Sequence, residues 1–470
     1  MNNKLFYILL ATEGLCFSTA KAQSDRPNIV FIMTDDLGAF DLGCYGSDFY
    51  ETPNIDRLAT QGLKFTQSYS AGANSAPSRA CFMTGMYAPR HGVYTVSPSE
   101  RGEASKRKLI PIANTEDVAS SFTTLAEALK QSGYECAHVG KWHMGSDDEG
   151  TGPLSQGFDL NIGGNKAGSP YSYFYPYCNK AHSKCHVALE EGRPGEYLTD
   201  RLTREAEHFI KNRDTSKPFF LYLAHYAVHS PLTAPQDLVD KYKKKVPGKH
   251  HKNPVYAAMI EKVDDGVGAL CELLDAQGLS DNTIFIFTSD NGGTSMATDN
   301  FPLRGEKGTP YEGGVRVPLI IRYPSKIAPK TATDVPVVNI DFFPTLVDLV
   351  HGQRPQGLDG ANIFDLLSAQ PTIQRDLFWH FPAYLEGYGR QEFRATPYSV
   401  IRSGDWKLIY YYETKQCELF NLKADVSERH NLATEYADRC AEMKQKLFSW
   451  LKTTHAPIPE KINPQYKNKE

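Results

Sequence analysis

The sequence lacks an excess of basic residues and, past its first residues, any long apolar run. Lys and Arg total 51 against 55 Asp and Glu, which gives a net charge of −4 at pH 7. Nucleic-acid binding needs a broad basic surface, and this balance does not provide one. No later segment approaches the ~20 consecutive apolar residues that span a bilayer. We therefore expect no nucleic-acid partner and no membrane span.

The sequence also has no Cys-x-x-Cys pair, although it contains nine cysteines. Structural zinc sites commonly use such pairs, so we expect no zinc site. Cys178 with Cys185, and Cys417 with Cys440, are candidate disulfides in an exported chain. The alternative, that most cysteines are buried thiols, stays open because spacing does not fix connectivity.

The first 22 residues have the pattern of a cleavable export signal. Lys4 supplies a positive charge, residues 5–10 form a short apolar core, and Ala20-Lys21-Ala22 provides an Ala-x-Ala cleavage site. The apolar stretch is too short to cross a bilayer. We predict that residues 1–22 are a signal peptide and that the mature protein is exported, to the periplasm or the extracellular space.

The chain after residue 22 alternates buried strand patterns with helical patterns. Continuous apolar runs at residues 29–33, 219–224 and 284–287 are typical of strands covered on both faces in a mostly parallel sheet. Helical spacing occurs between them, at residues 122–131 and 198–211. We therefore predict an α/β catalytic domain over residues 23–374, in which helices sandwich a mixed, mostly parallel sheet.

From about residue 375 the pattern changes to short antiparallel strands. Candidate strands cover residues 398–402, 406–412 and 418–422, and a helical pattern follows at residues 435–452. We predict a smaller α+β domain over residues 375–470.

Polar side chains follow two of the predicted parallel strands. Asp35 and Asp36 come directly after the first, and Asp290 and Asn291 come directly after the third. Sites in open α/β sheets form beyond the carboxyl ends of the strands. These hard oxygen ligands suit Ca²⁺ or Mg²⁺. Either pair alone would more commonly be a helix cap or an Asx turn.

A second cluster, Ser75-Ala76-Pro77-Ser78-Arg79, precedes a helix that we expect to begin near Ser78. A helix N-terminus offers free N–H groups to an anion, and the Arg79 guanidinium adds a planar fork for an oxyanion. This combination indicates a nucleophile, Ser75, at an anion site. The alternative is a turn that contains proline, followed by a capped helix.

The pattern S-x-P-S-R-x-x-x-x-T-G, from Ser75 to Gly85, resembles the signature of the formylglycine-dependent sulfatases, which belong to the alkaline-phosphatase-like superfamily. Further segments resemble that family in the same order along nearly the whole mature chain. These are Asp35-Asp36-Leu37-Gly38, Gly140-Lys141-Trp142-His143, His229-Ser230-Pro231, Asp290-Asn291-Gly292, Lys307 and its neighbours, and Gly313-Gly314-Val315-Arg316-Val317-Pro318.

This resemblance implies the site and its cofactors. One Ca²⁺ ion would be bound by the modified side chain at position 75 together with Asp35, Asp36, Asp290 and Asn291. A formylglycine-generating maturase would first oxidise Ser75 to formylglycine. Many relatives have Cys at this position, and the Ser here resembles the serine-type bacterial enzymes.

The resemblance also implies the catalytic roles. Arg79, Lys141 and Lys307 would offset the charge on the transferring sulfate group. His143 is the candidate base, and His229 is the candidate acid for the leaving oxygen.

The pattern most resembles bacterial sulfatases that act on sulfated galactose or N-acetylgalactosamine within glycans. We expect a 4-O-sulfate, with 6-O- and 3-O-sulfates left open. The alternatives are a phosphomonoester or phosphonate hydrolase of the same superfamily and a non-catalytic glycan-binding relative. Four loop residues are candidates for reading the sugar at the rim of the pocket: Arg304, His380, Arg390 and Arg394.

Overall fold

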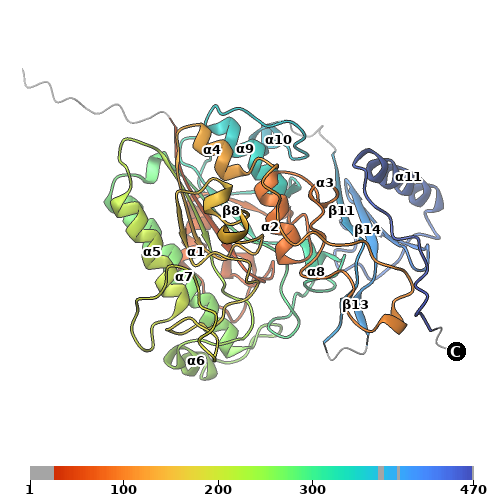
Figure 1. Ribbon diagram of the computed structural model, residues 1–470, viewed down its shortest axis with the longest axis horizontal. Helices are drawn as coiled ribbons and strands as arrows, with labels where there is room; N and C mark the ends of the chain where they lie inside the picture. Colours follow the sequence, from red (N-terminus) through yellow and green to blue (C-terminus); the bar gives the residue numbers. More distant parts are fainter. Residues whose placement is uncertain (1–25, 369–374, 389–391, 468–470) are drawn as a thin grey trace, which may run out of the picture.

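The computed structural model describes residues 26–368, 375–388 and 392–467 (Figure 1). The predicted signal peptide, residues 1–22, lies outside these residues. Within them, no helix has the length and apolar character to cross a membrane.

A central sheet of eight strands forms the main body of the molecule. Its first five strands in spatial order run parallel to one another, and β8 is antiparallel to β7. The complete order is β5 (Leu160–Ile162), β4 (Glu135–Gly140), β6 (Phe219–Ala224), β1 (Asn28–Thr34), β7 (Thr283–Ser289), β8 (Leu319–Arg322), β2 (Leu63–Phe65) and β9 (Thr331–Thr333).

Both faces of this sheet are covered. Successive side chains of β1 point to opposite sides, and each set is buried. Val30 and Ile32 pack into one core cluster, and Ile29, Phe31 and Met33 pack into another. Helices α1 (Pro53–Gln61), α5 (Leu198–Asn212), α6 (Gln236–Lys243) and α7 (Pro254–Ala276) contribute to the first cluster, and α2 (Ser75–Thr84), α4 (Leu125–Gln131), α9 (Phe342–Leu349) and α10 (Ile363–Ser368) contribute to the second.

The C-terminal part forms a separate antiparallel sheet, seen beside the central sheet in Figure 1. Helix α11 (Ala437–Thr453) packs against it through Met443, Leu447 and Leu451. Its strands are β11 (Asp376–Phe381), β14 (Tyr398–Ser403), β15 (Trp406–Tyr411) and β16 (Cys417–Asn421), next to the hairpin β12 (Leu385–Glu386) and β13 (Phe393–Ala395). The smaller elements are β3 (Ser68–Tyr69), β10 (Val337–Val338), α3 (Ala88–His91), α8 (Glu312–Val315), and the 3-10 turns η1 (Gly43–Tyr45), η2 (Ala104–Lys106), η3 (Asp147–Glu149), η4 (Leu154–Gln156), η5 (Ser280–Asn282) and η6 (Asn339–Asp341).

These elements confirm the predicted fold class, a mixed and mostly parallel sheet between helices with a C-terminal α+β part. The helix expected near Ser78 instead begins at Ser75, because Pro77 lies in its first turn, where a missing N–H costs no hydrogen bond. A third apolar cluster joins residues on both sides of position 375, and the domain division there stays a prediction.

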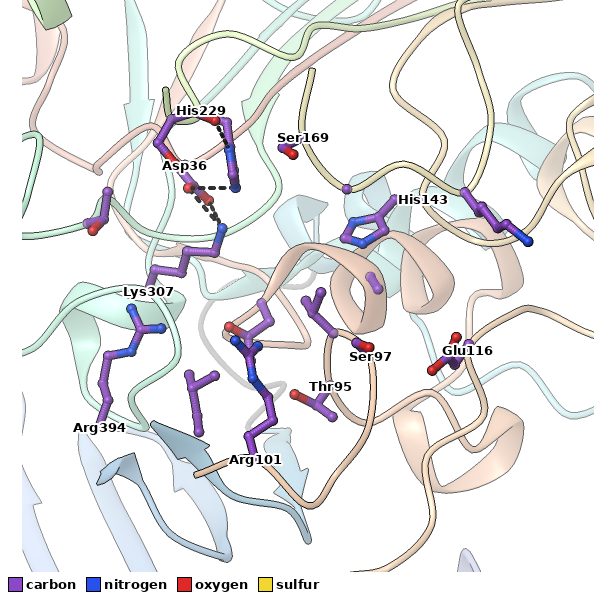
Figure 2. A pocket seen from close by; sticks show the side chains of 18 of the residues that line it. Asp36, Thr95, Ser97, Arg101, Glu116, His143, Ser169, His229, Lys307 and Arg394 are labelled. Atoms are coloured by element: carbon purple, nitrogen blue, oxygen red, sulfur yellow. Dashed lines mark hydrogen bonds and ion pairs between the residues drawn. The ribbon is translucent and has the colours of Figure 1, made fainter. Parts of the chain in front are cut away.

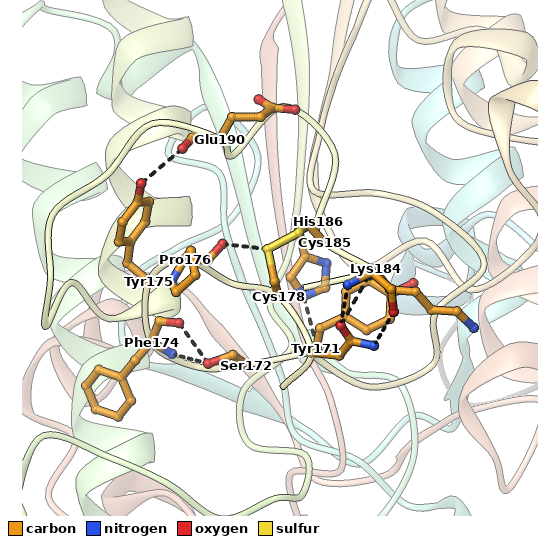
Figure 3. The surroundings of a disulfide bond; sticks show 12 residues. Tyr171, Ser172, Phe174, Tyr175, Pro176, Cys178, Lys184, Cys185, His186 and Glu190 are labelled. Carbon is orange, nitrogen blue, oxygen red and sulfur yellow. Dashed lines mark hydrogen bonds between the residues drawn. A yellow bond between two sulfur atoms is a disulfide. The ribbon is translucent and has the colours of Figure 1, made fainter. Parts of the chain in front are cut away.

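One of the two candidate disulfides is present. Cys178 and Cys185 are bonded in a loop that packs against the main body through His186, whose ring lies 4.5 Å from that of Tyr226 (Figure 3). Cys417 and Cys440 are free thiols, so the second pair is not formed in this structure.

Candidate active site

The carboxyl ends of four neighbouring parallel strands bring the predicted site residues together. Strand β1 pairs with β6 on one side and with β7 on the other, and β4 pairs with β6. The segments that follow these strands carry the polar side chains at one edge of the sheet. Asp35 and Asp36 follow β1, Asp290 and Asn291 follow β7, Lys141 and His143 follow β4, and His229 follows β6.

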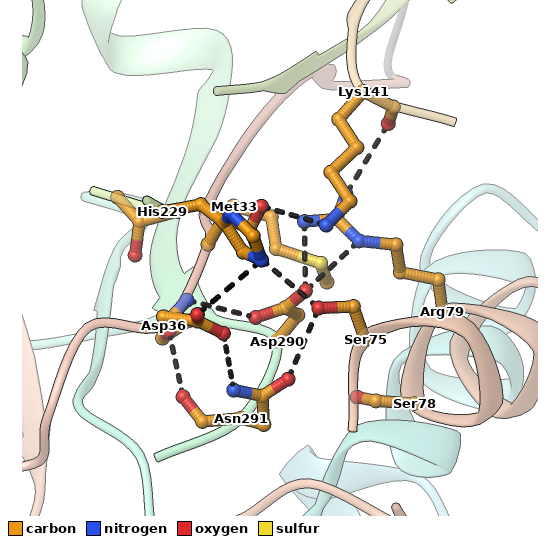
Figure 4. Close-up of polar contacts among 12 residues, drawn as sticks. Met33, Asp36, Ser75, Ser78, Arg79, Lys141, His229, Asp290 and Asn291 are labelled. Atoms are coloured by element: carbon orange, nitrogen blue, oxygen red, sulfur yellow. Dashed lines mark hydrogen bonds and ion pairs between the residues drawn. The ribbon is translucent and has the colours of Figure 1, made fainter. Parts of the chain in front are cut away.

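Ser75 is the first residue of α2, and its side chain points into this group (Figure 4). The Ser75 hydroxyl lies 3.0 Å from Asp35 Oδ1 and 3.2 Å from Asn291 Oδ1. Arg79 lies one turn later on the same helix, so its guanidinium reaches the same site. Ser75 is only 1% exposed. The helix therefore holds a nucleophile and a cation together in a buried position.

Three buried carboxylates are each paired with a cation. Lys141 Nζ lies 2.6 Å from Asp35 Oδ2, Lys307 Nζ lies 2.8 Å from both oxygens of Asp36, and Arg79 Nη2 lies 2.9 Å from Asp290 Oδ2. The six charges cancel. Buried charges need such pairing because their desolvation is costly.

Burial and pairing with an opposite charge shift the pKa values of these groups in opposite directions. Burial alone would raise the pKa of Asp35, but Lys141 and further nearby cations lower that pKa far below its usual range. For Asp290 burial prevails over Arg79 and raises the pKa to about 6. Burial lowers the pKa of Lys141, whereas Asp36 and Asp35 overcome burial at Lys307 and raise its pKa.

The oxygen atoms of this group have the chemistry of a divalent-cation site. Asp35, Asp36 and His229 each present a ligand atom within 4.8 Å of the others. Asn291 Nδ2 donates to Asp36 Oδ1 at 2.8 Å, so the amide oxygen faces Ser75. Hard oxygen donors of this kind fit Ca²⁺ or Mg²⁺.

Two histidines flank the buried charges. His229 Nδ1 donates to the carbonyl oxygen of Ser230 at 2.6 Å, so Nε2 faces Asp36 Oδ2 at 3.6 Å. His143 has a left-handed backbone with a φ of 66°, and its Nδ1 has no hydrogen-bond partner among the described residues. Burial, with Lys141 for His143 and Lys307 for His229, lowers the pKa of both rings. Both are therefore poised as neutral groups that can accept a proton.

A cavity of about 580 Å³ opens onto these residues (Figure 2). Asp36, His143, His229 and Lys307 form its inner end. Its outer walls come from residues 95–117, residues 145–169 and the β12–β13 hairpin. This volume is in the range of small-ligand sites and accommodates a sugar.

The structure thus brings together every residue predicted for the metal site and the catalytic pocket, and their roles stay predictions. Of the rim candidates, Arg394 lines the cavity. The prediction for His380 is wrong, because its ring is buried in the C-terminal sheet against the Ser399 hydroxyl and the Pro457 carbonyl. Arg304 lies over the Tyr311 ring outside the cavity, and Arg390 lies outside the described residues.

Most side chains of the outer cavity wall were not predicted from the sequence, among them Arg101, Glu116 and Tyr388. They belong to irregular segments with no motif, so no local pattern could have marked them. Tertiary packing brings them to the cavity, as where the Arg101–Glu386 ion pair joins the segment around residue 100 to the β12–β13 hairpin.

Known families, proteins and structures resemble this chain over most of its length. The family described as Sulfatase matches residues 27–352, and the family described as N-sulphoglucosamine sulphohydrolase, C-terminal, matches residues 306–454. A sulfatase of Formosa agariphila is 36% identical, in an alignment that covers 96% of this chain and 94% of that protein. Human N-acetylgalactosamine-6-sulfatase is 32% identical, over 77% of this chain and 69% of that protein. The crystal structure of Ps i-CgsB in complex with k-i-k-neocarrahexaose is 30% identical, with a TM-score of 0.77 and coverage of 93% of this chain and 95% of that one.

Proposed function

The chain belongs to the sulfatase family and is a sulfuric ester hydrolase, and on that premise we propose that it removes sulfate from O-sulfated galactose or N-acetylgalactosamine in glycans. The observation that carries the proposal is the position of Ser75. Its buried hydroxyl contacts Asp35, which is neutralised by Lys141, and the neighbouring residues Asn74 and Ala76 line a sugar-sized cavity. The names of the human relative and of the Ps i-CgsB complex both refer to carbohydrates, which supports this substrate class.

The proposal includes oxidation of Ser75 to formylglycine by a maturase. An unmodified serine would form a stable sulfate ester, whereas formylglycine supplies both a nucleophile and a route for expelling sulfate. Because Ser75 is 1% exposed, a separate enzyme would reach it before the chain has folded.

A Ca²⁺ ion fits the oxygen donors of Asp35, Asp36, Asp290 and Asn291. The three carboxylates and three cations cancel, so a divalent ion would leave the site with a positive charge that favours an anionic sulfate ester. When bound, the ion would polarise the sulfate oxygens and the nucleophile.

The cations and histidines of the chain have separate tasks in this proposal. Lys141 and Lys307 are held by Asp35 and Asp36, so their charges are fixed where the sulfate group would lie. Fixed charges stabilise a transition state without reorganisation. Neutral His143 would accept the proton from the nucleophile side, and His229 would donate a proton to the leaving sugar oxygen only after its Nε2 has taken one up. His229 is oriented for this by its Nδ1 bond to Ser230.

The test uses protein co-expressed with a serine-type maturase, in which peptide mass confirms a loss of about 2 Da at Ser75. The substrates are galactose and N-acetylgalactosamine sulfated at O3, O4 or O6, sulfated glucosamines and a phosphate monoester. We expect sulfate release from one position, abolished in Ser75→Ala and after Ca²⁺ chelation. The sequence favours the 4-O-sulfate, whereas the human relative is named a 6-sulfatase, so the panel decides between them.

Three outcomes would contradict the proposal. Phosphate release by protein with unmodified Ser75 would indicate a phosphomonoester or phosphonate hydrolase. Glycan binding without turnover, despite confirmed formylglycine, would indicate a non-catalytic relative. Sulfate release from sulfated glucosamines alone would support sulfatase activity but contradict the proposed galactose or N-acetylgalactosamine substrate.

A further inference from the structure

We propose that Arg394 and Arg101 form a second anion-binding subsite in the cavity, which binds a second negatively charged group of the glycan. That group is a further sulfate ester or a uronate carboxylate next to the sulfate that is removed. The inference deepens the proposed function and rests on it, because it names an additional feature of the substrate.

Arg394 presents a guanidinium whose hydrogen-bonding capacity is largely unused. Its Nη1 donates to the Tyr388 hydroxyl at 2.6 Å, and its guanidinium lies 4.6 Å from the centre of the Tyr388 ring. Its Nε is buried and has no hydrogen-bond partner among the described residues. Within that part of the chain, no carboxylate lies within 4.0 Å of Arg394, whereas Arg101 has Glu386. A guanidinium in this state suits a carboxylate or sulfate ligand, which it can bind with two parallel hydrogen bonds.

Arg101 adds a second cation to the same wall. Its Nη2 lies 2.7 Å from Glu386 Oε1. Glu386 belongs to β12 and Arg394 to β13, and these strands pair with Glu386 opposite Phe393, so one hairpin positions both groups. Arg101 is paired with Glu386, whereas Arg394 has no carboxylate within 4.0 Å among the described residues, so these three side chains together carry a net positive charge. In Figure 2 both arginines extend toward Lys307.

The opposite side of the cavity has the reverse sign. Glu116, Asp117 and Glu149 line it together with one cation, Lys166, which is paired with Glu149. Figure 2 shows Glu116 beyond His143, away from Arg101 and Arg394. A sugar with a single sulfate needs only the inner end of the cavity. The polarity of the outer walls therefore orients a substrate that carries a second anion, with its hydroxyl groups toward the acidic side.

The surface beyond Arg394 offers room for a neighbouring sugar. Arg394 and Tyr388 also line an adjoining open hollow of about 810 Å³. Its other charged side chains are Lys106, Glu103, Glu306 and Glu392, so Arg394 and Lys106 are the cations that an anionic group would meet there. Tyr388 is 46% exposed, and its ring can stack on a sugar face. The arginine thus lies between the place of the cleaved sulfate and the place of the next residue in the chain.

The first arm of the test measures binding without turnover. Ser75→Ala protein, loaded with Ca²⁺, is titrated by calorimetry with three disaccharides that carry the same cleavable N-acetylgalactosamine sulfate. The second sugar is neutral galactose, a uronate, or galactose with its own sulfate. We expect one of the charged probes to bind at least ~10-fold more tightly than the neutral one, and which of them does so identifies the anion. Arg394→Gln in the same background should remove this difference, and Arg354→Gln, at an exposed arginine that pairs with Asp348 outside the cavity, should keep it.

The second arm measures turnover by the matured enzyme. Arg394→Gln should raise the KM for the preferred charged substrate by about 10-fold with kcat retained, and should leave the singly sulfated substrate unchanged. Equal affinity of all three probes for Ser75→Ala protein would overturn the subsite, as would an equal loss for charged and neutral probes in Arg394→Gln. If the charged probes bind through Arg394 but no probe loses sulfate in the matured protein, the proposed hydrolysis fails and the subsite stands.

Discussion

At the scale of single residues, the site depends on charges that are fixed before a substrate arrives. Lys307 is held by both oxygens of Asp36 at 2.8 Å and also lines the cavity. Lys166 lines the same cavity but pairs with Glu149 on the opposite wall. The two lysines are therefore a matched pair, one in the reaction centre and one outside it.

Replacing Lys307 with Met should lower kcat/KM by about 10²–10³-fold, because one fixed charge on the transferring group is lost. Sulfate release by the matured enzyme measures this effect. Lys166→Met is the control and should change kcat/KM by less than about 3-fold. A loss of similar size in both variants would mean that general charge in the cavity, and not the position of Lys307, sustains the reaction.

His143 allows a prediction about pH. Burial and the neighbouring Lys141 lower the pKa of its ring well below 6.5. A base must be neutral, so a lowered pKa keeps His143 active at lower pH. The acid limb of the kcat/KM profile should therefore fall below pH 6.5, the ordinary histidine value. An acid limb at or above that value in the matured enzyme would exclude His143 as the base.

The sequence predicted the residues of the reaction centre better than those of the cavity wall, for a physical reason. Asp35 and Asp290 follow apolar runs that must be buried strands, and parallel strands bring such ends together. Arg79 is linked to Ser75 by one turn of helix. Arg101 reaches the cavity only through tertiary packing with Glu386, which no local pattern encodes.

At the scale of elements, the site requires that loops turn sharply as they leave the strands. Gly140 ends β4 with a φ of +107°, directly before Lys141. A Cβ there would lie 1.9 Å from the carbonyl oxygen of Ala224, which accepts the hydrogen bond of the Lys141 N–H at 2.7 Å. The close approach of β4 to β6 and the position of Lys141 therefore depend on the same glycine.

Gly140→Ala should lower the free energy of unfolding by about 3 kcal/mol and also reduce activity, since Lys141 must move. Urea denaturation and sulfate release measure the two effects. Gly150→Ala isolates the cost of the backbone angle, because Gly150 has a φ of +73° with nothing within 4 Å of its Cβ position. The free energy of unfolding of this control should fall by only about 1 kcal/mol. If both variants lose the same unfolding free energy, the close contact with Ala224 adds nothing to the cost of Gly140→Ala.

Elements of regular pattern were predicted closely, and errors occurred where tertiary context decides. The run at residues 219–224 is β6 without a shift, because its short length and aromatic content favour a strand buried on both faces over a buried helix. His380 was assigned to a loop, yet it lies within β11, which pairs with β14 through His380 and Ser399. A polar residue inside a short strand is predicted to lie in a loop when the sequence does not show which buried group it bonds.

At the scale of the whole molecule, burial of neutral histidines links folding to pH. Within the described chain, five histidines outside the cavity have their pKa lowered by burial, to about 4 for His138, His186 and His380 and to about 3 for His91 and His225. The unfolded chain binds a proton at each of them near pH 6.5, and the folded chain does not. Their contribution to stability is present above pH 6.5 and is lost as the pH falls toward these values.

Five carboxyl groups of the described chain act in the opposite direction. Burial raises the pKa of Asp264 and Asp290 to about 6 and that of Glu428 to about 7, and it also raises the pKa of Asp41 and Asp200. Their protonation in the folded state favours folding as the pH falls below these values. Because seven histidines, His143 and His229 included, have a lowered pKa against five carboxyl groups with a raised one, the net expectation is a loss of stability between pH 6.5 and 4.

His225 is the best place to test this link. Its ring is fully buried, and neither nitrogen has a hydrogen-bond partner among the described residues, so burial is the cause of its lowered pKa. His225→Leu removes the titration without leaving a polar group unpaired. The loss of unfolding free energy between about pH 7.5 and 4.5, measured by urea denaturation, should shrink by about 2 kcal/mol relative to the unsubstituted protein. His208→Leu on the exposed side of α5 is the control and should leave the pH dependence unchanged. If His225→Leu keeps the full pH dependence, His225 is not a source of the acid sensitivity, and the other buried histidines and the carboxylate pairs of the site remain as its sources.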